Sequence, residues 1–388
     1  LLSRVLSFGE PGDGLPSGAT ADYHLPSGLL VGPRHGGSQL LSPSKFRALV
    51  SGREHGFLAA LLRLTLRLAE FPYSLAISWR NHRYDTGAGI HRVAVPVVSV
   101  GNLTLGGTGK TPMVEWVVRW LLHRGARVTV ISRGYGAPEG TANDEAMELA
   151  QRLPEVPHLQ ESDRVAAAGK AVATSGSQVL VLDDAFQHRR IARDLDLVLL
   201  DALEPFGFDH VFPRGTLREP ATSLRRADVV ILTRAGMLDP PSREAIRQRV
   251  AGLAPRADWA EVDFRPHALR NASGIEEPIA SLSGKTVAAF CGVGNPAGFR
   301  HTLRMCGCRV IAFREFADHY RYTRADVESL LPWADGLEVE AVLCTHKDLV
   351  KLEVDHVGRR PLWAVTIFPE FLAGQDALES RLARLVPT

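Results

Sequence analysis

Residues 95–113 read VPVVSVGNLTLGGTGKTPM and have the types and spacing of a turn that binds nucleotide phosphates. In such a turn an apolar strand leads into glycines whose backbone N–H groups face the phosphates, and a helix follows with its positive end toward them. Lys110 then reaches the β and γ phosphates, and the hydroxyl of Thr111 binds Mg²⁺. The pattern G-x-x-x-x-G-K-[ST] departs here only at Thr104. We expect these residues to bind a nucleoside triphosphate: Thr104, Leu105, Gly106, Gly107, Thr108, Gly109, Lys110 and Thr111.

Two adjacent carboxylates, Asp183 and Asp184, follow a second apolar strand at residues 178–182. An aspartate at the end of a strand that follows a P-loop is the arrangement that holds Mg²⁺ in nucleotide-binding proteins. Two neighbouring carboxylates are costly to place together without a cation, which favours a metal site over a solvated turn.

Several other charged residues, each considered alone, fit either a functional or a purely structural role. Asp144 and Glu145 suit the positive first turn of a helix, whether or not they do chemistry. Arg133 and Arg218 lie in glycine-rich or proline-rich loops, where they would either clamp an anion or carry surface charge. His319 lies between an aspartate and a tyrosine, as a proton-handling group or as part of a surface turn.

The composition is that of a globular protein, with 45% hydrophobic and 23% charged residues. A chain of 388 residues is long enough for two domains. A net charge of +2 gives no support to nucleic acid as a partner. The four cysteines lack the paired C-x-x-C spacing of a zinc site, and a reducing cytosolic compartment is the default.

The chain divides into segments of different pattern. Strands expected at residues 127–132, 196–201 and 228–233 continue βα units after the P-loop. We expect an α/β fold with a P-loop NTPase-like, mostly parallel sheet, helices on both faces, a smaller C-terminal α/β domain and an N-terminal amphipathic helix. The predicted segments are a disordered leader at 1–44, the N-terminal helix at 45–84, the P-loop domain at 85–268, a linker at 269–284 and the C-terminal domain at 285–388.

The N-terminal helical pattern, strongest over residues 45–79, raises the question of a membrane. Leucines surround Arg63 and Arg67, but the longest uninterrupted apolar run, 57–62, is far shorter than the roughly 20 residues of a membrane span. A helix in the membrane interface, with arginines at lipid phosphates, and a core helix both fit. Pro72 is expected to end or kink the helix in either case.

Several motifs occur together in one order: VGNLTLGGTGKTP, SRGYG, NDEA, DDAFQHRR, LREP, FADHYRYT and THKDLVKL. In this order and spacing the chain resembles the tetraacyldisaccharide 4'-kinase family, the lipid A 4'-kinases, from about residue 44 to the C-terminus. The family has DDGFQH where this chain has Ala185, and usually GDEP where this chain has NDEA. Both departures leave the acidic residues in place.

The resemblance implies a kinase that transfers the γ-phosphate of ATP, with Mg²⁺, to the 4'-hydroxyl of an acylated glucosamine disaccharide 1-phosphate. It implies a peripheral or monotopic protein on the cytoplasmic face of the bacterial inner membrane, where the N-terminal helix docks. No nucleic acid or obligatory protein partner is expected.

The resemblance also implies roles for individual residues. Asp144 matches the family's proposed catalytic base and His319 its partner, while Lys110 holds the γ-phosphate. Thr111, Glu145, Asp183 and Asp184 match the surroundings of Mg²⁺. The candidate substrate-binding residues are Arg133, Gln187, His188, Arg218, Arg63 and Arg67.

Two other classes of protein share parts of this pattern. A P-loop ATPase or ligase that activates a small soluble acid would have the same strand, turn and aspartate pair, but it has no need of the leucine-rich and arginine-rich helix. A nucleotide-dependent switch would bind partners and hydrolyse nucleotide slowly, without phosphorylating a substrate.

Overall fold

The computed structural model describes residues 43–134, 144–318 and 320–386. The predicted leader at 1–44 lies outside these residues except for its last two positions, and so does His319. These described residues belong to a single compact unit.

The described strands form one mixed sheet in the order β10-β9-β11-β13-β7-β6-β5-β1-β4-β2-β3, with β8 beside β7 and β12 beside β13. Pairing is parallel except where β7 meets β13 and β8, and where β12 meets β13. The strands are β1 (Val97–Asn102), β2 (Val128–Ser132), β3 (His158–Gln160), β4 (Val179–Asp183), β5 (Leu195–Asp201), β6 (Val229–Thr233), β7 (Asp258–Arg270), β8 (Glu276–Pro278), β9 (Thr286–Cys291), β10 (Arg309–Glu315), β11 (Ala341–Thr345), β12 (His356–Val357) and β13 (Arg360–Ala373).

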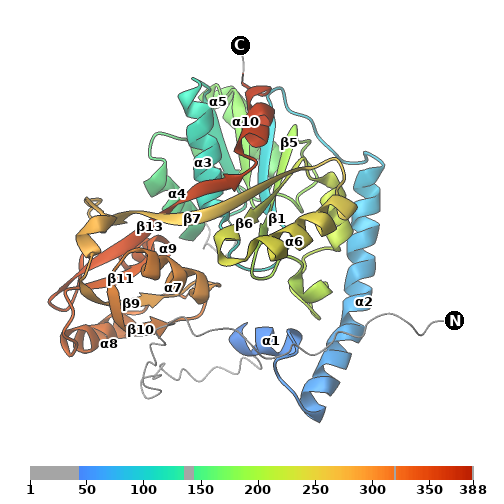
Figure 1. Ribbon diagram of the computed structural model, residues 1–388. Coiled ribbons are helices and arrows are strands. Elements are labelled where there is room, and N and C mark those ends of the chain that lie inside the picture. Colours follow the sequence, from blue (N-terminus) through green and yellow to red (C-terminus); the bar gives the residue numbers. More distant parts are fainter. Residues whose placement is uncertain (1–42, 135–143, 319, 387–388) are drawn as a thin grey trace. The chain divides into compact units, whose positions relative to one another are not determined.

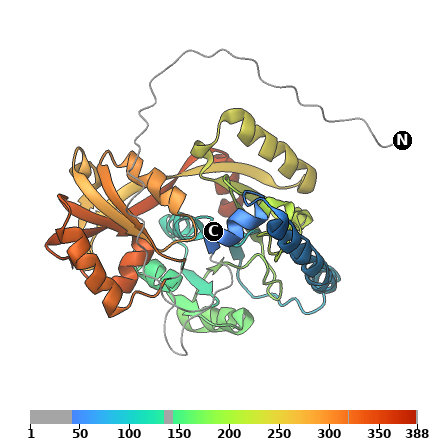
Figure 2. The same cartoon turned by 90° about the horizontal axis from the view of Figure 1, so that it is seen from below.

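Helices cover both faces of the strands, which confirms the predicted α/β architecture (Figures 1 and 2). Alternate residues of β1 show this, because Val98 faces one buried cluster and Val97 faces another. The α-helices are α1 (Pro43–Val50), α2 (Phe57–Asp85), α3 (Lys110–His123), α4 (Asp144–Arg152), α5 (Arg164–Ser175), α6 (Pro240–Leu253), α7 (Pro296–Met305), α8 (Arg324–Asp335), α9 (His346–Leu352) and α10 (Gln375–Ala383).

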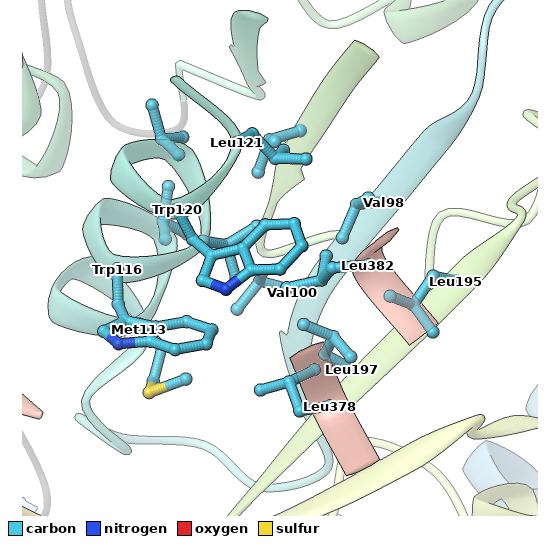
Figure 3. Close-up of a cluster of buried hydrophobic side chains, with 14 of the residues drawn as sticks. Val98, Val100, Met113, Trp116, Trp120, Leu121, Leu195, Leu197, Leu378 and Leu382 are labelled. Carbon is cyan, nitrogen blue, oxygen red and sulfur yellow. The ribbon is translucent and has the colours of Figure 1, made fainter. Parts of the chain in front are cut away.

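The core beneath the P-loop helix joins segments from distant parts of the sequence. Trp116 and Trp120 of α3 extend toward Val98 of β1, and Leu378 and Leu382 of α10 complete the cluster (Figure 3). Both leucines are fully buried. The second half of the chain therefore contributes to the core of the nucleotide-binding half, because α10 packs there after β13 returns.

The N-terminal helical pattern forms two helices instead of one. Gly52 and Gly56, both with positive φ, separate α1 from α2. Pro72 was expected to end or kink the helix, and it does not end it, since α2 continues through it to Asp85. Contacts beyond the proline, such as that of Asn81 with Glu219, hold the later turns in place.

The exposed face of α2 excludes the interpretation as a core helix. Of its 29 residues, only Ala59 and Asn81 are buried. Large apolar side chains recur every three or four residues and therefore share one face, which we call the apolar stripe. Its members are all exposed: Phe57, Leu61, Leu64, Leu68, Phe71, Leu75 and Trp79.

The long antiparallel pair of β7 and β13 joins the P-loop strands to β9, β10 and β11 (Figure 1). The predicted linker at 269–284 contains β8 and a short 3₁₀ turn, Ile279–Leu282. The domain boundaries at 268 and 285 stay a prediction. β7 crosses the first of them without a break.

The packing of α10 gives a test of the shared core. Leu378→Ala is expected to lower the free energy of unfolding by about 2–5 kcal/mol, because it leaves a cavity among buried side chains. Chemical denaturation followed by tryptophan fluorescence measures the change. Leu372→Ala, at a position 40% exposed in β13, is the matched control and should cost much less. Equal losses in the two variants would contradict the assignment of α10 to this core.

Candidate active site

One cavity of about 1390 Å³ brings the predicted motifs together. The P-loop turn, the end of β4, the start of α4 and the loop before Glu219 all line it, together with segments that follow β9 and β11. The carboxyl ends of β1 and β4, neighbouring parallel strands, lie at the same edge of the sheet, which explains why the two motifs meet. The lining of the cavity includes these predicted residues: Leu105, Gly106, Gly107, Thr108, Gly109, Lys110, Thr111, Arg133, Asp144, Glu145, Asp183, Asp184, Gln187, His188 and Arg218.

The P-loop turn depends on the conformation of Gly109. Its φ of 84° is in the left-handed region, which favours glycine, and it precedes the first residue of α3. The ring of Phe264 lies directly against it, since a Cβ atom at this position would fall 2.2 Å from Cζ of that ring. Lys110 follows with its side chain only 8% exposed.

Thr104 takes the place of a P-loop glycine without strain. It forms an antiparallel bridge with Leu217, and the backbone N–H of Leu105 donates to the carbonyl of Thr216 at 2.7 Å. An extended residue in such a pairing needs no glycine. Thr104 is also 3% exposed and does not line the cavity, so it packs beneath the phosphate-binding turn.

Asp184 lies at the centre of the charged groups. Its Oδ1 is 3.5 Å from Nζ of Lys110, and Nη1 of Arg218 donates to its two carboxylate oxygens at 2.8 and 2.9 Å. Burial by itself would raise the pKa of Asp184, but the charges of Lys110 and Arg218 outweigh this effect and hold the pKa well below its usual range. Asp184 is therefore a permanent anion beside the phosphate-binding lysine.

The pKa of Asp183 is shifted in the opposite direction from that of Asp184. Burial, followed by the charges of Glu145 and Asp184, raises its pKa to about 7. The carboxylate is 2% exposed and its Oδ1 has no hydrogen-bond partner among the described residues. A buried carboxylate oxygen that lacks a donor fits a cation, which would restore the ionised form.

The described residues contain no group of three or more His, Cys, Asp or Glu side chains placed to hold a metal ion. P-loop proteins bind Mg²⁺ through one or two carboxylates, a hydroxyl and the phosphates themselves. Asp183 and Thr111 both line the cavity and fit that donor set.

Asp144 begins α4, and a lysine from the second half of the chain reaches it. Nζ of Lys351, on α9, lies 3.6 Å from Oδ2 of Asp144 and 3.3 Å from Oδ1 of Asp348. Lys351 is 7% exposed at its side chain. The predicted partner His319 lies outside the described residues, so its place relative to Asp144 stays a prediction.

Buried polar contacts fix α4 in place. Nη1 of Arg152 donates to Glu115 of α3 at 2.7 Å, and its Nε donates to Glu148 at 3.0 Å. Nε2 of His346, on α9, lies 2.9 Å from Oε1 of Gln151. Because Arg152, Glu115 and Glu148 are buried, removing any one of them would leave a partner unsatisfied. The network therefore holds α4, and with it Asp144, between α3 and α9.

The THKD motif contributes a buried hydrogen-bond acceptor, Asp348, whose structural role its residue types did not predict. Asp348 is fully buried and accepts hydrogen bonds from the backbone N–H of Gly292, the hydroxyl of Tyr322 and the hydroxyl of Thr345. It thereby ties together the ends of β9 and β11 and the FADHYRYT segment. The available signal was the spacing Thr345-x-x-Asp348, which suits the N-terminus of a helix.

Segments from both halves of the chain also meet at the P-loop. Gly294 packs close to it, since a Cβ atom there would lie 3.4 Å from the backbone N of Gly107. Arg234 donates to the carbonyl of Gly107 at 2.9 Å and to Asp201 at 2.7 Å, and Asn295 donates to the same carboxylate at 3.2 Å. The motifs did not identify Arg234, whose role depends on this tertiary approach.

The candidate substrate-binding residues fall into two groups. Gln187 and His188 line the cavity with Arg133 and Arg218. Arg63 instead donates to the backbone carbonyl of Glu54 at 2.7 Å, and Arg67 contacts His210 and Glu70. Neither Arg63 nor Arg67 is among the described residues that line the cavity.

Comparison with known proteins identifies the family. Residues 62–387 match the family model described as tetraacyldisaccharide-1-P 4'-kinase. The chain belongs to the tetraacyldisaccharide 4'-kinase family. The relative from Anaeromyxobacter sp. (strain K), a tetraacyldisaccharide 4'-kinase, is 41% identical over 84% of this chain and 92% of its own length. The corresponding kinase of Geobacter sulfurreducens is 36% identical over 83% of this chain and 93% of its own length.

The solved structure of LpxK from Aquifex aeolicus in complex with ATP is 30% identical. It superposes with a TM-score of 0.67 over 84% of this chain and 100% of the other. Membership of the 4'-kinase family makes the chain a kinase, as its motifs predicted, and leaves the ligase and switch alternatives without support. None of the helices in the described part of the chain has both the length and the apolar character needed to cross a bilayer.

The P-loop geometry of this 4'-kinase family member predicts the effect of one added methyl group. Gly109→Ala is expected to weaken nucleotide binding at least about tenfold, because alanine opposes the positive φ and its Cβ collides with Phe264. Titration with a fluorescent ATP analogue measures the change. Gly169→Ala, within α5 where a Cβ meets nothing within 4 Å, is the control and should bind normally. Unchanged affinity in Gly109→Ala would rule out this conformation as the binding one.

Proposed function

We propose that the protein transfers the γ-phosphate of ATP to the 4'-hydroxyl of a tetraacylated glucosamine disaccharide 1-phosphate. The observation that carries the proposal is a single cavity that holds both the P-loop lysine, Lys110, and the carboxylate of Asp144. Phosphoryl transfer needs chiefly the positioning of two reactants and the neutralisation of charge, and these two groups supply one requirement each. Membership of the 4'-kinase family supports the acceptor.

The nucleotide would lie on the P-loop turn, with its phosphates at the start of α3. Backbone N–H groups of residues 106–111 and the positive end of this helix face that position. The ammonium group of Lys110, which contacts Asp184 in the structure, would instead bind the γ-phosphate, since the two anions compete for it.

Magnesium, when bound, would neutralise charge on the β and γ phosphates. We assign its ligands to Asp183 and the hydroxyl of Thr111, with Glu145 and Asp184 close to the same position. The unsatisfied oxygen and raised pKa of Asp183 support this assignment.

Asp144 would accept the proton of the 4'-hydroxyl as the new bond forms. Lys351 and the contacts of α4 orient this carboxylate, and His319 is proposed as its hydrogen-bonded partner. A sugar hydroxyl is a weak nucleophile at neutral pH, so a positioned base contributes about 10²–10⁴-fold to the rate. The side chains of Gln187 and His188, from the same segment as the aspartate pair, are proposed to contact the sugar.

The acyl chains of the acceptor would remain in the membrane, on which we propose that α2 docks. The apolar stripe supports this, because exposed large side chains in register on one helix face are typical of an interfacial helix. The opposite face of α2 contacts the nucleotide-binding half through Tyr73 and Asn81. The cytoplasmic face of the inner membrane is the proposed location, since ATP is available there.

The reaction is tested by following labelled γ-phosphate from ATP to tetraacyldisaccharide 1-phosphate in detergent micelles. The intact protein should give a bis-phosphorylated lipid, and Lys110→Ala should slow its formation at least about a hundredfold. Asp144→Ala should lower kcat by about 10²–10⁴-fold while leaving ATP binding intact. Binding of ATP with no labelled lipid under varied detergent and Mg²⁺ would refute the acceptor and revive the ligase or switch alternatives.

Membrane docking is tested with vesicles that contain anionic phospholipid. Replacing Leu64 and Leu68 together by glutamine should lower the partition coefficient about tenfold or more, because two apolar side chains no longer enter the lipid. Co-sedimentation with the vesicles measures the bound fraction. Thr65→Gln, at an exposed polar position of the same helix, is the matched control. If all three proteins sediment alike, the apolar stripe is not the docking surface.

A further inference from the structure

The turn that follows β4 has an unusual backbone. Asp184 has a φ of 47°, in the left-handed region, which aspartate tolerates better than most residues but adopts at a cost in free energy. The turn closes where the backbone N–H of His188 donates to the carbonyl of Ala185 at 2.8 Å. The direction of the Asp184 carboxylate, toward Lys110 and Arg218, depends on this backbone. Contacts around the turn must therefore stabilise it.

Carbonyl groups along this turn accept hydrogen bonds from one side chain, that of Arg193. Its Nη2 donates to the carbonyls of Ala185 at 2.6 Å and Phe186 at 3.4 Å, and also to the carbonyl of His188. Because all three carbonyls point toward the same nitrogen, the place of the guanidinium fixes the path of the chain from Asp184 to His188.

Arg193 is itself held firmly, just before β5. Its side chain is 10% exposed, and its Nη1 donates to Oδ2 of Asp196 at 3.3 Å. Asp196 belongs to β5, and its side chain is 6% exposed. Arg193 is not among the described residues that line the cavity. Any effect of this arginine on bound reactants is therefore transmitted through the turn.

Other contacts fix the remaining sides of the turn. Phe186 is fully buried and packs against β1, since a Cβ atom at Gly101 would lie 2.7 Å from the Cβ of Phe186. Arg164, on α5, donates to the carbonyls of Asp183 at 2.7 Å and Asp184 at 3.1 Å. The contacts of Arg193 begin at the next residue, so two arginines divide the carbonyls of the turn between them.

We propose that Arg193 is a positioning residue, which sets the aspartate pair in the orientation that binds the magnesium–nucleotide complex. The inference rests on the proposed function and adds a residue that acts without touching substrate or metal. Without the guanidinium, three carbonyls would lose their donor and the left-handed conformation of Asp184 would lose its support. The carboxylate would then turn away from Lys110. Residues that orient metal-binding side chains in this way are commonly worth 10- to 100-fold in metal affinity, by order of magnitude.

The test is a titration with a fluorescent ATP analogue, carried out once with excess Mg²⁺ and once with EDTA. The wild-type protein is expected to bind the analogue more tightly with Mg²⁺. Arg193→Met keeps most of the apolar stem but removes the donors, and it should reduce the gain from Mg²⁺ by about tenfold or more. Affinity in EDTA should change little, because the P-loop itself is unaltered.

Arg190→Met is the matched control, because Arg190 is an arginine of the same segment with a side chain 44% exposed. It should leave both affinities unchanged. Arg193→Lys should keep part of the gain from Mg²⁺, since an ammonium group still donates but lacks the planar shape of the guanidinium. Asp196→Asn, which removes the charge that anchors Arg193, should reduce the gain in the same direction and to a smaller extent.

Chemical denaturation of the same variants separates positioning from a purely structural role. A structural role alone would lower the stability of Arg193→Met and leave the gain from Mg²⁺ intact in the folded protein, and this result would overturn the proposal. Equal weakening with Mg²⁺ and with EDTA would also overturn it. If Arg193→Met does not fold, Arg193→Lys and Asp196→Asn decide by the same criterion. A wild-type protein whose affinity is the same with Mg²⁺ and EDTA would instead refute the magnesium site of the proposed function.

Discussion

Two adjacent carboxylates, one buried and the other partly buried, are costly at the end of a strand unless positive groups oppose them, and the site is built around this requirement. Asp183 ends β4 and Asp184 follows it, and three cations reach them from separate elements. Lys110 comes from the P-loop, Arg218 from the loop that pairs with Thr104, and Arg164 from α5. The opposed pKa directions of the two aspartates follow from this arrangement, because the cations neutralise Asp184 much more completely than Asp183.

The parallel strands and the phosphate-binding turn were predictable because their signals are local. An apolar run that ends in glycine or aspartate marks both the strand and the side chain at its carboxyl end, as β1 and β4 illustrate. β7 and β13 were harder to predict at their full lengths, because each is only partly buried and each contains a proline. The break between α1 and α2 depends on two glycines that the helical pattern of the surrounding leucines obscured.

Those residues of the site that belong to contiguous sequence motifs were predicted. Lys110, Asp144 and the aspartate pair were found from their neighbours, and the structure places them in one cavity. Arg234 and Lys351 were not assigned roles, because each acts on a segment far away in the chain. A single arginine or lysine on a helix carries no sequence signal that separates it from a solvated charge. Only the tertiary approach of α9, and of the turn after β6, to the cavity makes that distinction.

The position of α10 has a consequence for how the protein is made. Leu378 and Leu382 belong to a cluster that includes residues of β1, α3 and β5. A ribosome delivers the chain from its N-terminus, and domains usually fold as they emerge. Here the core of the nucleotide-binding half is incomplete until α10 has been synthesised. During that interval the cluster around Trp116 and Trp120 lacks two of its leucines, so we expect the nucleotide-binding half to reach its full stability only after the last helix has emerged.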